Sequence, residues 1–434
     1  MEFLSSVSYL FKALCTCGVA FVTGWFAHWV YRWMNPQCDG KLPPGSMGLP
    51  LVGETFRFFR ASASIDMPSY YKERLKRYGP IFKTSLVGQP LVISLDPEVN
   101  RFVFQQEGKL FRSWYPETTN TIFGKKSLTT YSGAVNKFVR SFASKLFGPT
   151  NLKESLLPEL ESAVRESFAT WVMNPSIEVK DGISNGRRNV HKTLTDLLKE
   201  RLSAPGEKYN DLIDQIIEEL QSENPVIDVN FAVDVLSALL FASFATLSST
   251  LSVGFKFLTD NPKVVKELKE EHTTILNKRG SLNSGFTWEE YKSLMFTSQV
   301  VHEITRISNV APGIFRKTLA DVKVKGYTIP AGWLVMISPM AVDLNPTLFE
   351  DPLEFNPWRW TDKTKQSELL RNYMPFGGGI RLCLGAEFSK LFIALFIHVL
   401  VTEYRWKEIK GGDVLRISEV IFPQGYHIQL IPHT

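Results

Sequence analysis

The sequence predicts a mainly α-helical protein with small β-sheets, carried behind a membrane-spanning helix at its N-terminus. Three observations lead to this fold class. Residues 13–31 are mostly apolar and end in a group of aromatic residues. Long stretches with apolar residues at helical spacing follow, among them residues 229–258. Short alternating runs bounded by glycine and proline, such as 80–86 and 90–95, are typical of strands in small sheets.

The composition is that of a globular chain. Of 434 residues, 44% are hydrophobic and 21% are charged, so the chain can bury a large core. The formal net charge of +5 is small, and no basic run is interleaved with aromatic residues, so nucleic acid is not an expected partner. A mildly basic surface suits an anionic membrane or an acidic redox partner. Since Cys15, Cys17 and Cys38 lie near the N-terminus, disulfides cannot hold the body together, and a reducing compartment is expected.

Residues 1–34 are predicted to be a membrane anchor. The apolar run is long enough to cross a bilayer, and Trp25 and Trp29 suit its interface. No small-residue cleavage site follows, which favours a retained anchor over a removed signal peptide. A buried core helix is the alternative. Arg32 and Lys41 beyond the span favour a cytosolic body by the positive-inside rule.

Residues 35–50 are predicted to be a proline-rich hinge, and residues 51–434 one large helical domain. The hinge contains L-P-P-G-S-M-G-L-P, which has no helical option. Apolar periodicity predicts helices at 67–77, 132–147, 152–171, 229–258 and 288–308, strands at 80–86 and 90–95, and a hairpin at 322–332.

The stretch from Tyr373 to Glu387 carries the strongest chemical signal. Three glycines, 377–379, precede Cys383, and an apolar helical run follows it. A helix N-terminus favours the thiolate form of a cysteine, and glycines let the backbone pass close to a large flat partner. Arg381, two residues before the sulfur, can neutralise an acid group. A glycine turn before a core helix is the alternative.

Residues 375–385, which read P-F-G-G-G-I-R-L-C-L-G, resemble the haem-binding signature of cytochromes P450, F-G-x-G-x-R-x-C-x-G, at every fixed position. The resemblance implies the cytochrome P450 fold, haem b as the cofactor and Cys383 as the axial thiolate ligand of the iron. A thiolate in this position favours O–O cleavage. The same resemblance implies that Phe376, Arg381 and Gly385 bind the haem.

A second motif lies upstream. Glu303 and Arg306 are spaced at i, i+3 and therefore lie on one helix face, where such a pair is usually solvated and contributes little. Here the pair resembles the E-x-x-R motif of cytochromes P450, and Arg359 in F-N-P-W-R-W resembles its third member. The resemblance implies a structural clamp that holds the loop carrying Cys383.

Three further polar positions follow from the resemblance. Arg140 and Arg316 are implied as anchors of the haem propionates, although position 136 is Asn where the family often has Trp or His. An exposed helix arginine is the alternative for Arg140. Thr246 in F-A-S-F-A-T resembles the threonine on the oxygen side of the haem, with Ala245 in place of the usual acid. The alternative is a buried threonine that bonds its own i−4 carbonyl.

The candidate substrate-lining residues are apolar and bulky, so a large hydrophobic substrate is expected. They are Leu240, Phe244, Ile314, Phe315 and Phe422.

The junction of Asn185 and Gly186 departs from the family pattern. Cytochromes P450 of this clan have further helices there, which roof the substrate cavity. Roughly 40 residues are missing by this comparison, about three helices of mean length, as a skipped exon or a mis-predicted gene would produce. One wall of the pocket is therefore expected to be absent.

The wording A-P-G-I-F-R-K-T and F-N-P-W-R-W most resembles the plant cytochrome P450 family 87. That resemblance implies hydroxylation of a sterol or tetracyclic triterpenoid with O₂ and electrons from NADPH–cytochrome P450 reductase. It also implies a single-pass protein of the endoplasmic reticulum membrane. Two alternatives stay open: a haem-thiolate isomerase or dehydratase that needs no reductase, which Ala245 permits, and a truncated, non-catalytic isoform.

Overall fold

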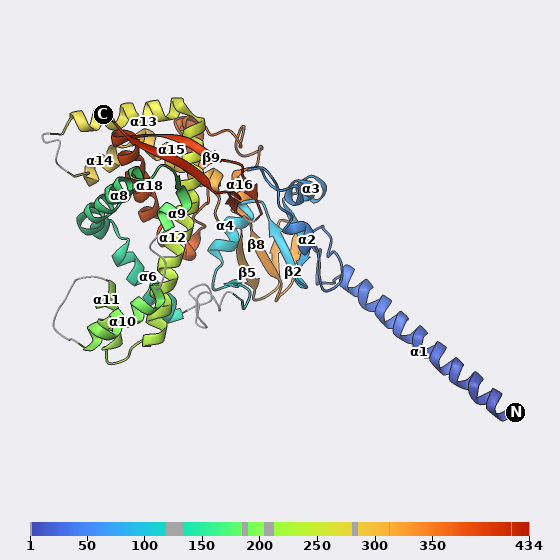
Figure 1. Ribbon diagram of the computed structural model, residues 1–434. Coiled ribbons are helices and arrows are strands. Elements are labelled where there is room, and N and C mark those ends of the chain that lie inside the picture. Colours follow the sequence, from blue (N-terminus) through green and yellow to red (C-terminus); the bar gives the residue numbers. More distant parts are fainter. Residues whose placement is uncertain are drawn as a thin grey trace.

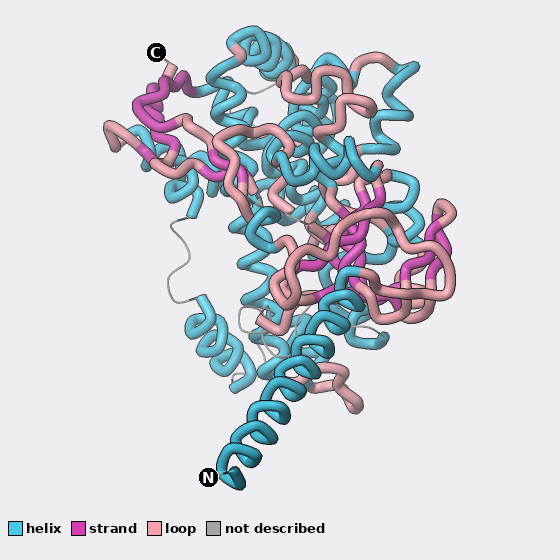
Figure 2. The backbone as a smooth tube through the Cα atoms, turned by 90° about the vertical axis from the view of Figure 1, so that its right-hand side faces the viewer, coloured by secondary structure: helices cyan, strands magenta, loops and turns pink. Residues whose placement is uncertain are grey.

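The computed structural model describes residues 2–118, 133–184, 190–203, 212–279, 285–311, 313–417 and 419–433. A large helical body lies beside a smaller strand-rich part, and helix α1 (Glu2–Met34) projects away from both (Figure 1). In the view turned by 90°, the strands form two groups on opposite sides of the molecule, one of them beside the C-terminus, and the N-terminal part of α1 extends beyond the body (Figure 2). The predicted class, mainly α with small sheets, is confirmed.

Two described helices are long and apolar enough to cross a membrane. One is the Leu14–Met34 part of α1, which has a mean hydropathy of 1.2 and is not buried at all. The other is α12 (Val229–Asp260), with a mean hydropathy of 1.8 and 44% of its apolar window buried. Because Leu251 and Phe255 of α12 pack in the main core, α12 is a core helix, and α1 is the candidate anchor.

The main core lies among α8 (Leu157–Val172), α12, α13 (Pro262–Asn277), α15 (Met295–Ser308) and α18 (Ala386–Glu403). Helix α15 lies at the centre and contacts α12, α13 and α18. Gly254 permits the close approach of α12 and α15, since a Cβ at this position would lie 3.1 Å from Cδ1 of Ile304. The core therefore fixes α12 and α18, the helices that lie above and below the site described next.

The larger sheet has the strand order β1-β2-β8-β5-β3. Strands β2 and β8 are parallel, and the other neighbouring strands are antiparallel. The β1–β2 turn contains Val87 and Gly88, both with positive φ, as a two-residue hairpin turn requires. The strands are β1 (Ile81–Leu86), β2 (Gln89–Ser94), β3 (Phe111–Ser113), β5 (Ile314–Thr318) and β8 (Leu334–Ile337).

Smaller sheets and short helices complete the fold. The three-stranded sheet has the order β4-β12-β9, and two hairpins pair β6 with β7 and β10 with β11. These strands are β4 (Ile177–Glu178), β6 (Val322–Val324), β7 (Tyr327–Ile329), β9 (Tyr404–Gly411), β10 (Leu415–Arg416), β11 (Val420–Ile421) and β12 (Tyr426–Pro432). The other helices are α2 (Thr55–Phe58), α3 (Ser69–Tyr78), α4 (Pro97–Gln105), α6 (Gly133–Leu146), α7 (Pro149–Asn151), α9 (Val179–Ser184), α10 (Val190–Ser203), α11 (Leu212–Leu220), α14 (Trp288–Ser293), α16 (Pro339–Asp343) and α17 (Lys363–Asn372).

Two predicted helices differ from the observed ones. The helix predicted at 288–308 is split into α14 and α15, because Leu294 has a ψ of 80° and leaves the helical conformation. The helix predicted at 152–171 begins with a π-helical turn, Leu152–Leu156, before α8. Asn185 and Gly186, where helices were predicted to be missing, lie outside the described residues.

Candidate functional site

The loop between α17 and α18 holds the cysteine. The backbone N–H of Cys383 donates to the carbonyl of Phe376 at 3.0 Å, and the N–H of Gly377 donates to the carbonyl of Met374 at 3.0 Å. Gly377 has a φ of 73°, which favours glycine. These bonds fold the loop back on itself and leave the Cys383 side chain exposed to an adjoining cavity.

Gly378 and Gly379 lie against another part of the protein, the residue Phe104. A Cβ on Gly378 would lie 2.8 Å from a ring carbon of Phe104, and one on Gly379 would lie 2.4 Å from the Phe104 carbonyl oxygen. Phe104 belongs to α4, so these glycines let α4 press against the loop. All three glycines were expected to let the backbone pass close to a large flat partner. In the structure, Gly378 and Gly379 are instead required by the contact with Phe104. Gly377 alone of the three borders the cavity.

The cavity beside Cys383 has a volume of about 370 Å³. Helices α6 and α12, strand β5 and the cysteine loop surround it. Leu247 and Val139 contribute to its apolar walls, and three arginines supply positive charge. Of the predicted site residues, the cavity brings together Arg140, Thr246, Ile314, Arg316, Phe376, Arg381 and Cys383.

Opposing influences act on the thiol of Cys383. Burial raises the pKa of Cys383, while the backbone N–H of Gly385 and the charge of Arg140 act to lower this pKa. Burial by the surrounding loop is the larger influence, so the pKa of Cys383 is raised overall even though the side chain borders the cavity. A metal cation at the sulfur deprotonates a coordinating thiol outright. The loop therefore suits a cysteine that is a ligand.

The three arginines reach the cavity from separate elements. Arg140 lies on α6, one helical turn after Asn136, and its Nη1 donates to the carbonyl of Leu382 at 3.3 Å. Burial lowers the pKa of Arg140, and the neighbouring Arg381 lowers it further. Arg316 lies two residues after Ile314 on β5, so both side chains point to the same face of the strand.

Thr246 lies on the stretch of α12 that faces the cavity. Its hydroxyl donates to the carbonyl of Ala242 at 2.6 Å, the i−4 bond that the sequence analysis gave as the alternative. The side chain is exposed and lines the cavity, so the hydroxyl oxygen keeps the capacity to accept a hydrogen bond from that side.

The other predicted residues do not border this cavity. Leu240 is 44% exposed on α12, and Phe244 is half-buried on the same helix. Phe315 points to the opposite side of β5 from Ile314 and packs against Trp114 and Tyr115, with ring centroids 6.2 and 5.9 Å apart. Phe422 stacks on Tyr426, and Gly385 caps α18 below the sulfur.

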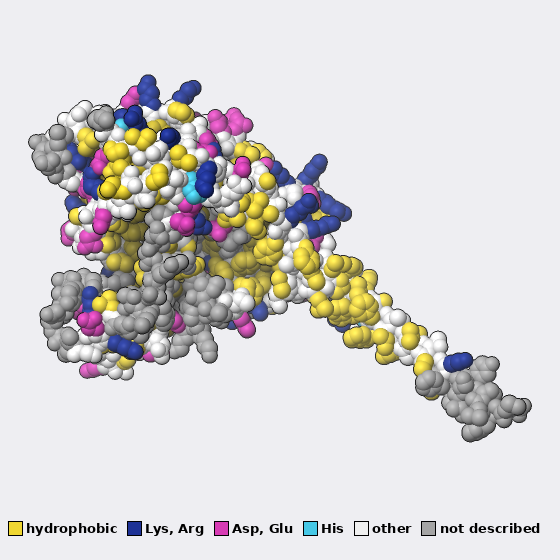
Figure 3. Space-filling model, viewed as in Figure 1, with side chains coloured by type: hydrophobic (Ala, Val, Ile, Leu, Met, Phe, Trp, Pro, Cys, Tyr) yellow, Lys and Arg dark blue, Asp and Glu magenta, His cyan; other side chains and the backbone are white. Residues whose placement is uncertain are grey.

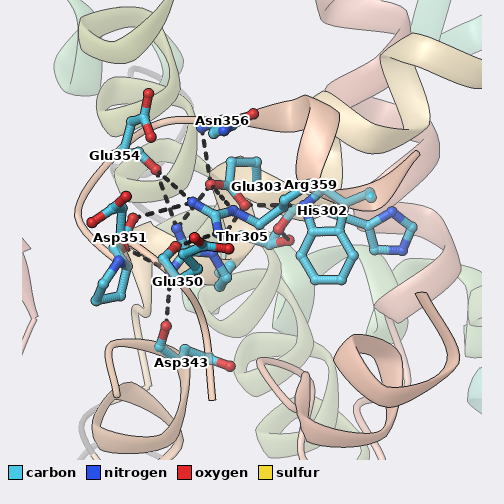
Figure 4. A network of polar contacts seen from close by, with 12 residues as sticks. His302, Glu303, Thr305, Asp343, Glu350, Asp351, Glu354, Asn356 and Arg359 are labelled. Carbon is cyan, nitrogen blue, oxygen red and sulfur yellow. Dashed lines mark hydrogen bonds and ion pairs between the residues drawn. The ribbon is translucent and has the colours of Figure 1, made fainter. Parts of the chain in front are cut away.

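Glu303, Arg306 and Arg359 form one buried network (Figure 4). Oε1 of Glu303 accepts from Nη2 of Arg306 at 2.8 Å and from Nε of Arg359 at 3.0 Å. Its Oε2 accepts from Nε of Arg306 at 2.9 Å and from Nε1 of Trp360 at 3.0 Å. The arginines also donate to backbone carbonyls of residues 343 and 350–354, so the network joins α15 to the segment that precedes α17.

Two contacts extend this network to the cysteine loop. The hydroxyls of Thr305 and Tyr373 lie 2.5 Å apart, and Tyr373 packs edge-on against the ring of Trp360. Tyr373 is two residues before Pro375, where the loop motif begins. The clamp therefore acts on the loop through Tyr373, since its charged groups bond to one another and to backbone carbonyls upstream.

Several residues of the site were missed by the sequence analysis. Glu107 forms ion pairs with Arg316 and Arg381. Tyr115 and Phe104 line the cavity, and Asp343 lies buried beside the clamp. None belongs to a motif with fixed spacing, and Glu107 lies more than 200 residues from either arginine in sequence, so no local pattern could have found it.

Comparison with known proteins decides the family. The cytochrome P450 family model matches residues 43–174 and 166–428. This chain belongs to the cytochrome P450 family. Cytochrome P450 87A3 of Oryza sativa subsp. japonica is 45% identical to it, over 93% of this chain and 88% of the relative. The predicted resemblance to plant cytochrome P450 family 87 is thus confirmed, and the chain is a P450 monooxygenase by enzyme class.

Two further relatives of this P450 are named for their reactions. The beta-amyrin 16-alpha-hydroxylase CYP87D16 of Maesa lanceolata is 36% identical, over 95% of this chain and 98% of the relative. The cucurbitadienol 11-hydroxylase of Siraitia grosvenorii is 35% identical, over 94% and 97%. Among solved structures, the retinoic acid-bound cyanobacterial CYP120A1 has a TM-score of 0.76 at 23% identity, over 91% of this chain and 100% of that one, which supports the fold alone.

The comparison with rice P450 87A3 also bears on the length of this P450. The alignment runs over 455 positions, and 93% of 434 residues fills about 404 of them. About 50 aligned positions are therefore ones that this chain lacks. That number is close to the roughly 40 residues expected from the sequence.

Proposed function

We propose that this P450 hydroxylates a sterol or tetracyclic triterpenoid, using O₂ and electrons from NADPH–cytochrome P450 reductase at the endoplasmic reticulum membrane. One observation carries the proposal: the Cys383 side chain opens onto an apolar cavity whose edge holds Arg140, Arg316 and Arg381. A thiol on one face, apolar walls and a basic edge are the groups that an iron porphyrin with two carboxylates requires. The residues present therefore fit haem b.

In this proposal each residue has a separate task. Cys383 would be the thiolate ligand of the iron, and Arg140, Arg316 and Arg381 would hold the propionates. The Gly385 N–H, which lowers the pKa of Cys383, donates to the sulfur and tunes it as a ligand. Haem iron with a thiolate ligand supplies the activation of O₂. The Thr246 hydroxyl would position water on the side of the haem where O₂ reacts. Phe376 would pack beside the cofactor.

The substrate class rests on the relatives and on the apolar wall. The two relatives named as hydroxylases act on beta-amyrin and cucurbitadienol, which are large apolar molecules. Ile314 lines the cavity, and Leu240 and Phe244 lie further along α12 on a stretch that is partly exposed. A hydrophobic molecule that spans both regions would contact this helix along several turns.

Membrane attachment has support beyond the apolar α1. Leu51 and Phe56, just after the hinge, are 70% and 81% exposed, and Val87 is 70% exposed. Gly88 lies against the carbonyl of Leu51, so these side chains form one apolar patch. Hydrophobic side chains run along α1 and continue onto the adjoining part of the body (Figure 3). Exposed apolar patches of this kind mark interaction surfaces, and here the bilayer is the natural partner.

A second candidate, a non-catalytic isoform, is favoured by one observation. The middle of α12 is partly exposed at Leu240, which does not border the cavity, between stretches of the same helix that are largely buried. The positions missing from this chain would account for that exposure if they formed the roof helices near Asn185 and Gly186. Substrate would then lack one wall of its pocket.

The experiment is expression in yeast of the full chain, with and without a plant reductase, together with sterol and triterpene substrates. A matched chain receives the corresponding segment of cytochrome P450 87A3 between Asn185 and Gly186. We expect a thiolate-type Soret band in the reduced CO difference spectrum of both chains and a hydroxylated product that depends on NADPH and reductase. A folded preparation without that band contradicts the haem-thiolate assignment. Turnover without reductase favours an isomerase or dehydratase, and product from the restored chain alone favours the non-catalytic isoform.

A further inference from the structure

Glu107 is a buried carboxylate that joins two of the three cavity arginines. Its Oε1 lies 3.1 Å from Nε of Arg381 and accepts the backbone N–H of Ser113 at 3.0 Å. Its Oε2 forms an ion pair with Nε of Arg316. The side chains of Glu107, Arg316 and Arg381 are 4%, 3% and 14% exposed, so the interaction is shielded from solvent.

The three side chains come from three separate parts of the chain. Glu107 follows α4, Arg316 belongs to β5, and Arg381 lies in the cysteine loop two residues before Cys383. Both arginines line the cavity, whereas Glu107 lies behind them. Glu107 contacts each guanidinium through its Nε, on the stem side of the group. It therefore holds Arg381 by a hydrogen bond and Arg316 by an ion pair without hydrogen-bond geometry, and it does not occupy the cavity.

The charges favour a function beyond packing. Two buried guanidinium groups that share one site repel each other, and a carboxylate between them offsets that repulsion. Arg140, Arg316 and Arg381 together with Glu107 carry a net charge of +2, which equals and opposes the charge of the two propionates of haem b. Without Glu107 the same group would carry +3.

We propose that Glu107 is a positioning residue for the haem propionates, which aims Arg316 and Arg381 at the cavity and matches the charge of the arginine group to the cofactor. The proposal rests on the proposed function, because it assumes that haem occupies this cavity. Groups that orient the direct partners of a metal centre typically change its affinity by 10–100-fold when they are lost. Glu107 stands in that relation to the propionate arginines.

The test uses two variants of the full chain and one control. E107Q keeps the shape and removes the charge, while E107D keeps the charge but is one methylene too short to reach both arginines. E54Q is the control, because Glu54 and Arg74 form an equally buried ion pair, with side chains 6% exposed, among residues that do not line the cavity. Haem loss is measured by transfer to apomyoglobin, the ferric/ferrous midpoint potential by spectroelectrochemistry, and stability by the thermal midpoint.

We expect haem loss to be about tenfold faster in both Glu107 variants. In E107Q the midpoint potential shifts to more positive values, because a negative charge near the iron is removed. In E107D the potential stays closer to that of the wild type. E54Q lowers the thermal midpoint and leaves the potential and the haem loss of the folded fraction unchanged.

Wild-type haem loss together with an unchanged potential in E107Q overturns the proposal. Faster haem loss in E107Q with no change in potential also overturns the proposal if E54Q loses haem equally fast at the same drop in thermal midpoint. If E107Q does not fold, E107D decides: faster haem loss from folded protein supports the proposal, and the wild-type rate overturns it. A folded wild type that binds no haem overturns the proposed function and this inference together.

Discussion

The hydroxyl groups of Thr305 and Tyr373 lie 2.5 Å apart and connect α15 to the segment that enters the cysteine loop. The Thr305 hydroxyl donates to the carbonyl of Val301 at 2.7 Å, so its oxygen accepts the hydrogen bond that the Tyr373 hydroxyl donates. Burial raises the pKa of Tyr373, which keeps that phenol protonated and able to donate. The clamp residues Glu303 and Arg306 lie on the same helix as Thr305, so this bond, together with the packing of Tyr373 on Trp360, links the clamp to the loop.

Tyr373→Phe is predicted to loosen the loop more than it destabilises the fold. The lost hydrogen bond costs about 1 kcal/mol, because Thr305 keeps its bond to Val301 and no buried donor is stranded. The fraction of haem protein that lacks the thiolate-type Soret band should rise. Tyr426→Phe is the control, since Tyr426 bonds Thr259 at 2.9 Å in the helical body. Equal spectra for the two variants would show that the Tyr373 bond does not hold the loop.

Glu303→Ala is predicted to destabilise the folded haem domain strongly. It leaves the buried Arg306 and the largely buried Arg359 without their shared carboxylate, and breaking a buried charge pair in this way costs about 3–5 kcal/mol. Glu289→Ala is the matched control, because Glu289 is 72% exposed and pairs with Lys153 at 2.9 Å. An exposed pair of this kind contributes about 0–1 kcal/mol. The comparison is read from urea unfolding midpoints, and similar midpoints for the two variants contradict the role of the clamp.

Contacts between residues that are close in the sequence are predicted better than contacts between distant segments. Glu303 and Arg306 share a helix face by spacing alone, and Arg359 joins them in the structure as the family motif implies. Phe315 was predicted to line the pocket together with Ile314, and the structure places it on the other face of β5, because adjacent strand residues point to opposite faces of a sheet. Its position depends on which face of β5 meets the cavity, and the tertiary packing of Trp114 and Tyr115 decides that.

The glycine loop and the buried acids show a second limit. Gly378 and Gly379 match the motif, yet the contact that requires them is with Phe104, on a helix nearly 300 residues earlier. The polar partners of the Asp343 and Glu107 side chains come from distant segments, so the burial of both residues is set by the assembled fold. No periodicity in the sequence reports such a contact.

The free energy of unfolding of the wild type is predicted to fall as pH rises, and Asp343→Asn is predicted to abolish the part of this fall that Asp343 causes. Burial raises the pKa of Asp343 from 3.8 to about 8, while Arg306 and the side chain of Asn309 act to lower it. Between these values the unfolded chain releases a proton that the folded chain keeps. The free energy of unfolding therefore falls as pH rises from about 4 to 8, by at most about 1.4 kcal/mol per pH unit.

The measurement is urea unfolding of both proteins at several pH values from 5 to 8. Groups that titrate identically in both proteins cancel in the difference. The wild type should lose stability relative to the variant across this range. A difference in stability that does not change with pH would mean that Asp343 is ionised in the folded protein.

Thr246→Ala is predicted to lower the coupling of NADPH consumption to product without changing the stability of the fold. The hydroxyl lines the cavity and bonds only the i−4 carbonyl of its own helix among the contacts described, so its removal costs little stability. Haem content and thermal midpoint should stay at wild-type values. Because Ala245 supplies no acid, the exposed Thr246 hydroxyl is the candidate for organising water on this helix segment, where Thr250 also lines the cavity but is buried. The share of NADPH electrons that appears in hydroxylated product should therefore fall, with a matching rise in hydrogen peroxide.

Ser243→Ala provides the control on the same helix. Ser243 donates to the carbonyl of Leu240 at 3.0 Å and is not among the residues that line the cavity, so its loss removes a similar bond without changing the cavity. Coupling of NADPH consumption to product should match the wild type in this variant. If Thr246→Ala couples NADPH consumption to product as efficiently as Ser243→Ala does, proton delivery passes through another group. Thr246 then has only its hydrogen bond to the Ala242 carbonyl.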